Sequence, residues 1–179
     1  MKILQKTLTS ILIFSALSTA DTFEQNGVKE GNNRISINLT SALHNDSGAD
    51  ASGYVYGQYG KFLTNDIEVF FDTFLSKGTL KGTDGIDKSS VTYMLGAGAN
   101  YYFLKSPTLT PYVGTQIFYS DAITDAKGEF DIKGSKHYLA AHKFLNENTS
   151  ITVETGIRIY DFKDYKQTYW DIYLSYFFD

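Results

Sequence analysis

The last residues of the chain, 168–179, read TYWDIYLSYFFD. Alternate positions of this stretch fall into two sets with different chemistry. The first set holds only apolar and aromatic side chains: Trp170, Ile172, Leu174, Tyr176 and Phe178. The second set mixes aromatic rings with Asp171 and Ser175. Because successive side chains of a β-strand point to opposite faces, this alternation predicts a strand with one wholly apolar face.

The same alternation recurs along most of the chain, in segments that are separated by turn residues. No stretch keeps apolar residues at helical spacing for long enough to indicate a helix. Besides the closing stretch, seven segments are predicted to be strands: 34–43, 52–63, 67–76, 91–103, 110–119, 130–145 and 150–162. The facing of 52–63 and 130–145 is ambiguous, because tyrosines fill both registers of the first and charges interrupt the second.

The connections between these segments differ in length. Short ones follow Leu63, Phe103 and Leu145, whereas the other four are mostly longer and rich in Gly, Asp, Lys and Ser. Aromatic residues gather near both ends of the predicted strands. Short turns at one end, longer polar loops at the other and two aromatic bands are typical of a transmembrane β-barrel of the outer-membrane type.

The chain begins MKILQKTLTSILIFSALSTA, in which Lys2 and Lys6 precede an apolar run that ends in small residues. This pattern predicts a cleaved secretory signal peptide over 1–20. The polar, turn-rich residues 21–33 are predicted to form a flexible lead, and residues 34–179 a single barrel domain.

Composition narrows the function further. The 179 residues include 16 Lys and Arg against 20 Asp and Glu, and the formal net charge of −4 argues against a nucleic-acid partner. The chain has no cysteine, which excludes a thiol nucleophile and a cysteine-ligated metal.

Alternation shows two faces of each strand but not which face lies inside the barrel. The face opposite the apolar one mixes glycines, large aromatics and isolated charges, which suits the crowded interior of an eight-stranded barrel. We therefore expect the apolar face of 170–178 to contact lipid. Charges of both signs on the other face are expected to pair inside the barrel as one lumen cluster: Glu68, Asp72, Glu154, Arg158 and Asp171.

Four stretches carry a resemblance to a known group of proteins: GKFLTNDIEV at 60–69, LGAGANYYF at 95–103, TPYVG at 110–114 and IYLSYFF at 172–178. They resemble the small eight-stranded outer-membrane barrels of Gram-negative bacteria, of the OmpA-barrel, OmpX and OmpW kind. The resemblance implies an all-β fold, a single antiparallel eight-stranded transmembrane β-barrel in the cell outer membrane. It also implies outer-membrane lipid and the barrel-assembly machinery as partners. Such barrels usually end on an aromatic residue, whereas here Asp179 follows Phe178.

The sequence predicts no catalytic, cofactor or metal site. His137 and His142 are five residues apart on a predicted strand, so they point to opposite faces and cannot form a metal pair. Neither is followed two residues later by the serine that the lipid A deacylases among these barrels use. Gly96 and Gly98 lie within an alternating strand, which favours tight packing inside the barrel over a phosphate loop.

These observations predict a non-enzymatic outer-membrane protein with a structural or surface-interaction role through its extracellular loops. The sequence does not indicate which extracellular ligand they bind. Two alternatives stay open. One is a narrow conduit for small or hydrophobic compounds, which the similarity to OmpW implies. The other is a soluble periplasmic lipid-binding barrel, which would carry polar residues outside and an apolar cavity inside.

Overall fold

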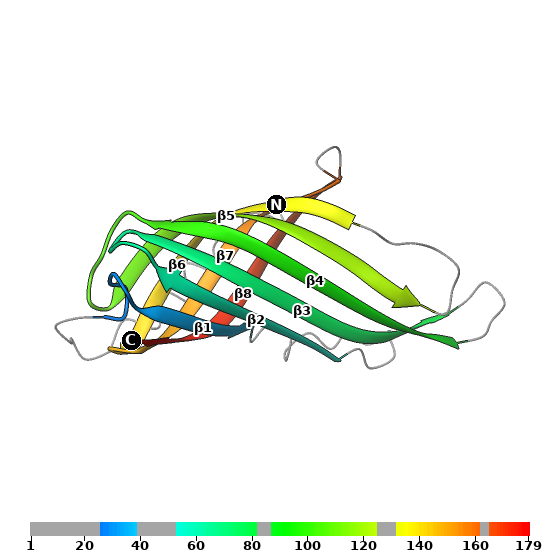
Figure 1. Cartoon of the computed structure of the whole chain (residues 1–179), viewed down its shortest axis with the longest axis horizontal. Helices are drawn as coiled ribbons and strands as arrows, with labels where there is room; N and C mark the ends of the chain where they lie inside the picture. Colours follow the sequence, from blue (N-terminus) through cyan, green and yellow to red (C-terminus); the bar gives the residue numbers. More distant parts are fainter. Residues whose placement is uncertain (1–25, 39–52, 82–86, 125–131, 162–164) are drawn as a thin grey trace, which may run out of the picture.

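The computed structural model describes residues 26–38, 53–81, 87–124, 132–161 and 165–179. They form eight strands: β1 (Asn33–Asn38), β2 (Gly53–Phe62), β3 (Ile67–Lys81), β4 (Asp87–Tyr102), β5 (Leu109–Thr124), β6 (Ile132–Asn146), β7 (Thr149–Tyr160) and β8 (Tyr165–Phe178). Each strand pairs with its neighbours in sequence, and β1 pairs antiparallel with β8, so the sheet closes into a barrel (Figure 1). The predicted all-β, eight-stranded antiparallel barrel is confirmed. Among the described residues, no helix is long and apolar enough to cross a membrane.

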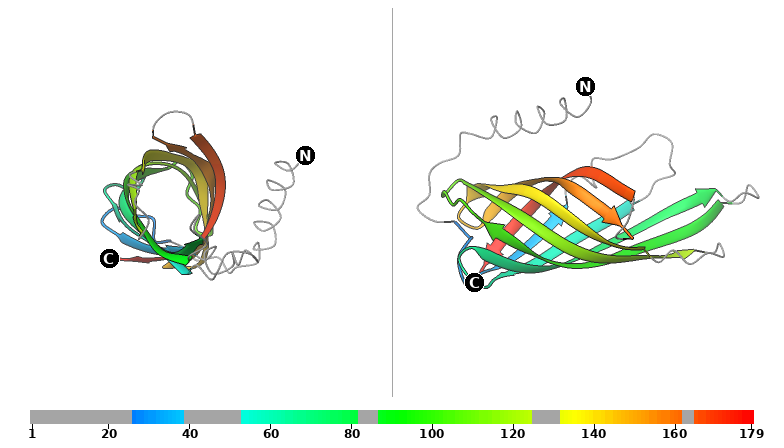
Figure 2. Two further views of the ribbon diagram at one scale, coloured as in Figure 1. Left: turned by 90° about the vertical axis from the view of Figure 1, so that its right-hand side faces the viewer. Right: turned by 90° about the horizontal axis from the view of Figure 1, so that it is seen from above.

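The strands are staggered round the barrel. Paired residues can be followed from Ile35 on β1, strand by strand, to Lys166 on β8, whereas Ile35 itself pairs with Tyr176, ten residues further along β8. A stagger of this size tilts the strands against the barrel axis, as Figure 2 shows. Each step from β1 toward β8 across the strands therefore also rises toward the end that carries the longer connections.

Three strands are longer than the sequence pattern predicted. β3 continues to Lys81, β4 begins at Asp87 and β5 ends at Thr124, whereas the pattern predicted limits of 76, 91 and 119. The added residues pair across β3 and β4 through their backbones, as Lys81 does with Asp87. Backbone hydrogen bonds extend a hairpin whatever the side chains are, so a polar extension leaves no alternating signal.

The two faces of the barrel wall differ in chemistry. Large apolar side chains are exposed on the outer face of every strand, among them Ile35, Val55, Phe71, Leu95, Ile117, Leu139, Ile157 and Tyr176. Polar side chains are buried on the inner face, among them Arg34, Glu68, Asn100, Gln116, His142 and Thr152. A water-soluble barrel would carry the opposite arrangement, because exposed apolar surface in water is unfavourable.

Residues 26–32, which precede β1, lie across the end of the barrel that carries the short turns; they are called the capping segment below. Asn26 Nδ2 donates hydrogen bonds to the Ser106 carbonyl at 2.8 Å and to Thr110 Oγ1 at 3.1 Å, at the β4–β5 turn. Val28 is buried in the aromatic cluster of the interior, and the Gly31 N–H donates to the Phe62 carbonyl at 3.0 Å. Residues 26–32 of the predicted flexible lead thus contact the barrel, and 21–25 lie outside the described residues; the flexibility of the lead stays a prediction.

Glycines let the inner face of β4 approach its neighbours closely. A Cβ at Gly98 would overlap with the backbone carbonyl oxygen of Thr115 and with the ring of Phe70. We expect Gly98→Ala to lower the free energy of unfolding by about 1–3 kcal/mol, because the backbone oxygen cannot move aside. Denaturant unfolding in lipid vesicles measures the effect. Gly57→Ala is the control, because a Cβ there meets nothing within 4 Å and the change should stay within about 0.5 kcal/mol. Equal effects at both sites would contradict the packing argument.

Candidate functional site

The barrel interior is built around an ion pair between β1 and β3. Arg34 Nε donates a hydrogen bond to Glu68 Oε1 at 2.7 Å, and the two side chains are 1% and 0% exposed. The remaining guanidinium nitrogens donate to Ser36 Oγ and to Gln58 Oε1. A buried ion pair is favourable only when further hydrogen bonds satisfy its partners, and the guanidinium of Arg34 meets this condition.

The carboxylate of Glu68 carries the contacts on to β4. Its Oε2 accepts hydrogen bonds from Asn100 Nδ2 at 2.8 Å and from the Tyr102 hydroxyl at 2.7 Å. The Tyr102 hydroxyl also lies 3.3 Å from His142 Nε2 on β6, and Nδ1 of the same imidazole lies 2.6 Å from Thr152 Oγ1 on β7. Glu68 is thus linked across the interior to the far wall of the barrel.

Contacts with β8 complete a closed loop of hydrogen bonds. Thr152 Oγ1 lies 3.2 Å from Ser175 Oγ, which lies 2.7 Å from Ser36 Oγ. The resulting closed loop of hydrogen bonds is called the polar ring: Arg34, Glu68, Tyr102, His142, Thr152, Ser175 and Ser36. It joins six of the eight strands, and no member is more than 1% exposed. The polar ring therefore crosses the barrel interior as a filled layer.

An aromatic layer lies between the polar ring and the capping segment. The ring of Phe177 is 5.1 Å from that of Phe144 and 6.1 Å from that of Phe62, measured between centroids. Tyr112 stacks on the His142 imidazole at 4.8 Å. All four aromatic side chains are buried, so the end with the short turns is closed by apolar packing as well as by the capping segment.

A second charged group lies further toward the long connections. Lys136 Nζ is 2.6 Å from Glu154 Oε1, and both side chains are almost fully buried. Glu154 also accepts a hydrogen bond from the Tyr169 hydroxyl at 2.8 Å. The ammonium of Lys136 lies 4.9 Å from the Tyr169 ring centroid and 5.1 Å from that of Tyr138, within range of cation–π attraction.

Asp72 has no cation among its direct partners on the described residues. Its carboxylate accepts a hydrogen bond from the Tyr56 hydroxyl and one from Gln116 Nε2 at 2.8 Å. In the described part of the chain, Gln116 Oε1 is the one buried side-chain polar atom without a hydrogen-bond partner. The interior is therefore a nearly satisfied network, which is typical of a structural core.

The third charged group is partly exposed to solvent. Arg158 Nη2 lies 3.1 Å from Asp171 Oδ2, with the side chains 31% and 14% exposed. The guanidinium carbon of Arg158 lies 4.3 Å from the Tyr169 ring centroid. The Tyr173 hydroxyl, 3.3 Å from Asp171 Oδ2 and 3.4 Å from Glu154 Oε1, connects this pair to the second group.

The five residues predicted to form one lumen cluster all lie on the inner face, but only Arg158 and Asp171 are direct partners of each other. Arg158 pairs with Asp171, whereas Glu68, Asp72 and Glu154 have other partners. Sequence reasoning missed two cations that are almost fully buried, Arg34 and Lys136. The position of Arg34 on the polar face of the first predicted strand was a usable signal. Lys136 was hidden by the ambiguous facing of 130–145.

The apolar residues of β8 that were predicted to contact lipid lie on the outer face. Trp170 and Tyr176 are 40% and 52% exposed, and Ile172, Leu174 and Phe178 are partly exposed. The opposite residues Tyr173, Ser175 and Phe177 are buried inside.

His137 and His142 point to opposite faces of β6, as their spacing on a strand predicted. His142 belongs to the polar ring inside the barrel, and His137 lies on the outer face between Thr115 Oγ1 at 3.0 Å and Ser135 Oγ at 3.1 Å. No group of three or more His, Asp or Glu within the described ranges is arranged to hold a metal ion.

A closed barrel of eight antiparallel strands with an apolar exterior and a polar interior is the fold of the small outer-membrane β-barrels. Among solved structures, the outer membrane protein OprG of Pseudomonas aeruginosa is 13% identical, with a TM-score of 0.55 over 87% of this chain and 99% of that one. Ail, the attachment invasion locus protein of Yersinia pestis, is 16% identical, with a TM-score of 0.52 over 83% and 99%. Its backbone structure in a phospholipid bilayer nanodisc gives 18% identity and a TM-score of 0.54 over 83% and 100%. At these identities the likeness concerns the fold. No family model and no curated protein matches the chain.

Proposed function

We propose that the chain is a non-enzymatic outer-membrane β-barrel protein with a closed interior, which acts through its outer surface and its longer connections. The observation that carries this proposal is the polar ring, a buried loop of hydrogen bonds that joins six strands across the interior. The apolar exterior supports a membrane location, because lipid accepts exposed Ile, Leu and Phe side chains.

The interior supports a closed barrel over a conduit. A path along the axis would have to cross the polar ring, the aromatic layer and the capping segment in turn. Eight strands leave an interior just wide enough for side chains to fill. The soluble lipid-binding alternative requires an apolar cavity, whereas the buried groups here include the Arg34–Glu68 and Lys136–Glu154 ion pairs.

Conductance tests the closed interior. We expect the folded chain, inserted into a planar lipid bilayer, to give no stable current steps, because ions cannot pass a filled cross-section. Gel migration of the same sample with and without heating reports folding, so that a silent bilayer is not mistaken for unfolded protein. Reproducible openings from folded protein would favour the narrow conduit instead.

A second measurement tests the surface role. Residues 39–52, 82–86, 125–131 and 162–164 connect the strands at the end opposite the short turns and lie outside the described residues. The experiment compares two kinds of cells for their attachment to coated surfaces. One kind carries the whole chain, and the other carries a chain in which residues 125–131 are replaced by an equal number of Gly and Ser residues. Equal attachment after exchange of each of the four segments would contradict a role through the loops.

A further inference from the structure

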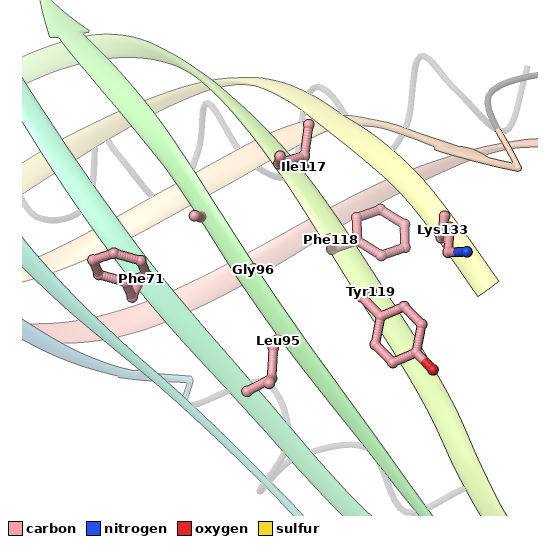
Figure 3. Close-up of a pocket in the computed structure, with 8 residues that line it drawn as sticks. Phe71, Leu95, Gly96, Ile117, Phe118, Tyr119 and Lys133 are labelled. Carbon is pink, nitrogen blue, oxygen red and sulfur yellow. The ribbon is translucent and has the colours of Figure 1, made fainter. Parts of the chain in front are cut away.

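A histidine interrupts the apolar outer face of the barrel on β6. His137 is exposed there, with its Nδ1 3.0 Å from Thr115 Oγ1 and its Nε2 3.1 Å from Ser135 Oγ. Thr115 is the residue paired with His137 on β5, and Ser135 is the neighbouring outward-facing residue of β6. These three side chains are called the outer polar patch. Large apolar side chains flank it, Ile117 on β5 (Figure 3) and Ile157 on β7, which are 64% and 42% exposed.

The outer polar patch lies at a depth that lipid tails occupy. Along β6, His137 is four residues from the exposed Lys133 and eight residues from the exposed Leu145. For strands tilted by about 45°, these separations correspond to roughly 9 Å and roughly 19 Å along the barrel axis. The apolar band of an outer-membrane barrel is about 25 Å tall, so His137 lies well inside it. Polar and ionisable side chains at such a depth are costly unless they have partners.

The hydrogen bonds within the outer polar patch leave one donor over. A neutral imidazole brings one N–H and one acceptor nitrogen, and each hydroxyl brings one hydrogen. The two contacts use two of these three hydrogens, because the imidazole donates to one hydroxyl and accepts from the other. Within the part of the chain that the structure describes, these side chains have no further hydrogen bond. One hydroxyl hydrogen is therefore left without an acceptor, which is unfavourable in lipid.

A second copy of the chain can supply the acceptor. Lipid tails offer none at this depth, so the acceptor has to come from protein. The outer polar patch is complementary to itself, because a hydroxyl both donates and accepts hydrogen bonds. Two copies that keep the same end outward are related by a two-fold axis along the membrane normal, which can place the same patch of each copy face to face. Ser, Thr and His side chains that hydrogen-bond across an interface are typical of association within membranes.

The apolar residues beside the outer polar patch fit the same arrangement. Two steps across the strands lead from Ile117 to Ile159 on β7, and Ile157 lies two residues lower, which offsets the rise that the stagger adds. Ile117 and Ile157 therefore stand on opposite sides of the patch at similar depth. A two-fold axis through the patch brings Ile117 of one copy against Ile157 of the other.

We propose that two copies of this chain associate in the membrane through the outer faces of β5, β6 and β7, with the outer polar patch on the two-fold axis. The spare hydroxyl hydrogen of each copy donates to a hydroxyl oxygen of the other. The proposal rests on the membrane location proposed above and adds a partner and an interface to it.

Disulfide trapping in lipid vesicles tests the interface, because the chain has no cysteine of its own. We expect the double variant Ile117→Cys and Ile157→Cys to form covalent dimers under mild oxidation. Within one copy β6 separates the two positions by about 10 Å, too far for a disulfide. The control pair, Ile37→Cys and Thr73→Cys, is separated in the same way by β2 but lies away from the patch. Absence of covalent dimers, or equal dimer formation by both pairs, would overturn the proposed interface.

Sedimentation equilibrium in density-matched detergent tests the outer polar patch itself. We expect the unchanged chain to form dimers, and Thr115→Val or His137→Leu to weaken the dimer about tenfold. Thr73→Val removes a hydroxyl from the outer face of β3 and should leave the dimer unchanged. Dimers that none of these variants weakens would overturn the role of the patch, and a purified chain that stays monomeric would overturn association with a second copy.

Heat-modifiable gel migration of the same samples tests the folded barrel separately. Valine and leucine suit the lipid-facing wall, so both patch variants should stay folded. Folded monomers would contradict the second copy alone, whereas loss of the folded form in the unchanged chain would contradict the proposed membrane barrel.

Discussion

Replacing Glu68 with leucine is expected to lower the free energy of unfolding by about 3–5 kcal/mol, the cost of leaving a buried charge without its partner. The Arg34 guanidinium would lose its carboxylate, and the Asn100 amide and Tyr102 hydroxyl would lose an acceptor. None of these groups can turn to water, because Arg34, Asn100 and Tyr102 are all almost fully buried. Urea unfolding of the chain in phospholipid vesicles, followed by tryptophan fluorescence, measures the loss.

An exposed ion pair of the same chain provides the control. Lys105 Nζ lies 2.5 Å from Asp66 Oδ1, with the side chains 32% and 53% exposed. Asp66→Leu should cost at most about 1 kcal/mol, because water replaces the lost partner. If Glu68→Leu proved as mild as Asp66→Leu, water would have to reach Arg34, and the polar ring would not be a filled layer. That result would also weaken the proposal of a closed interior.

The contrast between the two carboxylates shows what the sequence reveals about this barrel. Period-two alternation identifies strands without knowledge of the fold, because it records two faces in different surroundings. It placed Glu68 on the inner face correctly, since Ile67 and Val69 beside it are both exposed on the outside. The ends of β3, β4 and β5 were missed for the converse reason, since backbone pairing beyond position 76 needs no apolar face.

The pairing of charges inside the barrel depends on information that a single strand does not contain. Arg34 and Glu68 meet because β2 lies between β1 and β3 with a fixed register, in which Gly60 pairs with both Arg34 and Phe70. Gly60 has no side chain, and a Cβ there would overlap with the Glu68 carboxylate. The ion pair thus passes over a glycine on the intervening strand. Composition and alternation show neither the register nor this gap, so the sequence predicted inner charges without their partners.

Replacing Leu174 with arginine tests the opposite face of the wall. Leu174 lies on the outer face of β8, and its partners Ile37 on β1 and Ile151 on β7 are both apolar. Leu174 is the next outward-facing residue after Ile172, which lies midway along the strand between Lys166 and Phe178. An arginine near the bilayer midplane should lower the free energy of unfolding by about 2–4 kcal/mol, because lipid does not solvate the guanidinium. Unfolding in vesicles and the yield of folded, heat-modifiable barrel measure the effect.

Lys166→Arg is the matched change on the same strand. Lys166 is exposed at the end that carries the long connections, where a cation can reach the membrane surface, so the substitution should change stability by about 0–1 kcal/mol. Lys166→Arg keeps an existing charge at the membrane surface, so its small effect shows that β8 accepts an arginine side chain there, whereas Leu174→Arg adds a charge near the midplane. If Leu174→Arg were also neutral, the outer face of β8 would have to lie in water. The apolar side chains from Trp170 to Phe178 would then be a surface for another protein rather than for lipid, and the membrane assignment would fail.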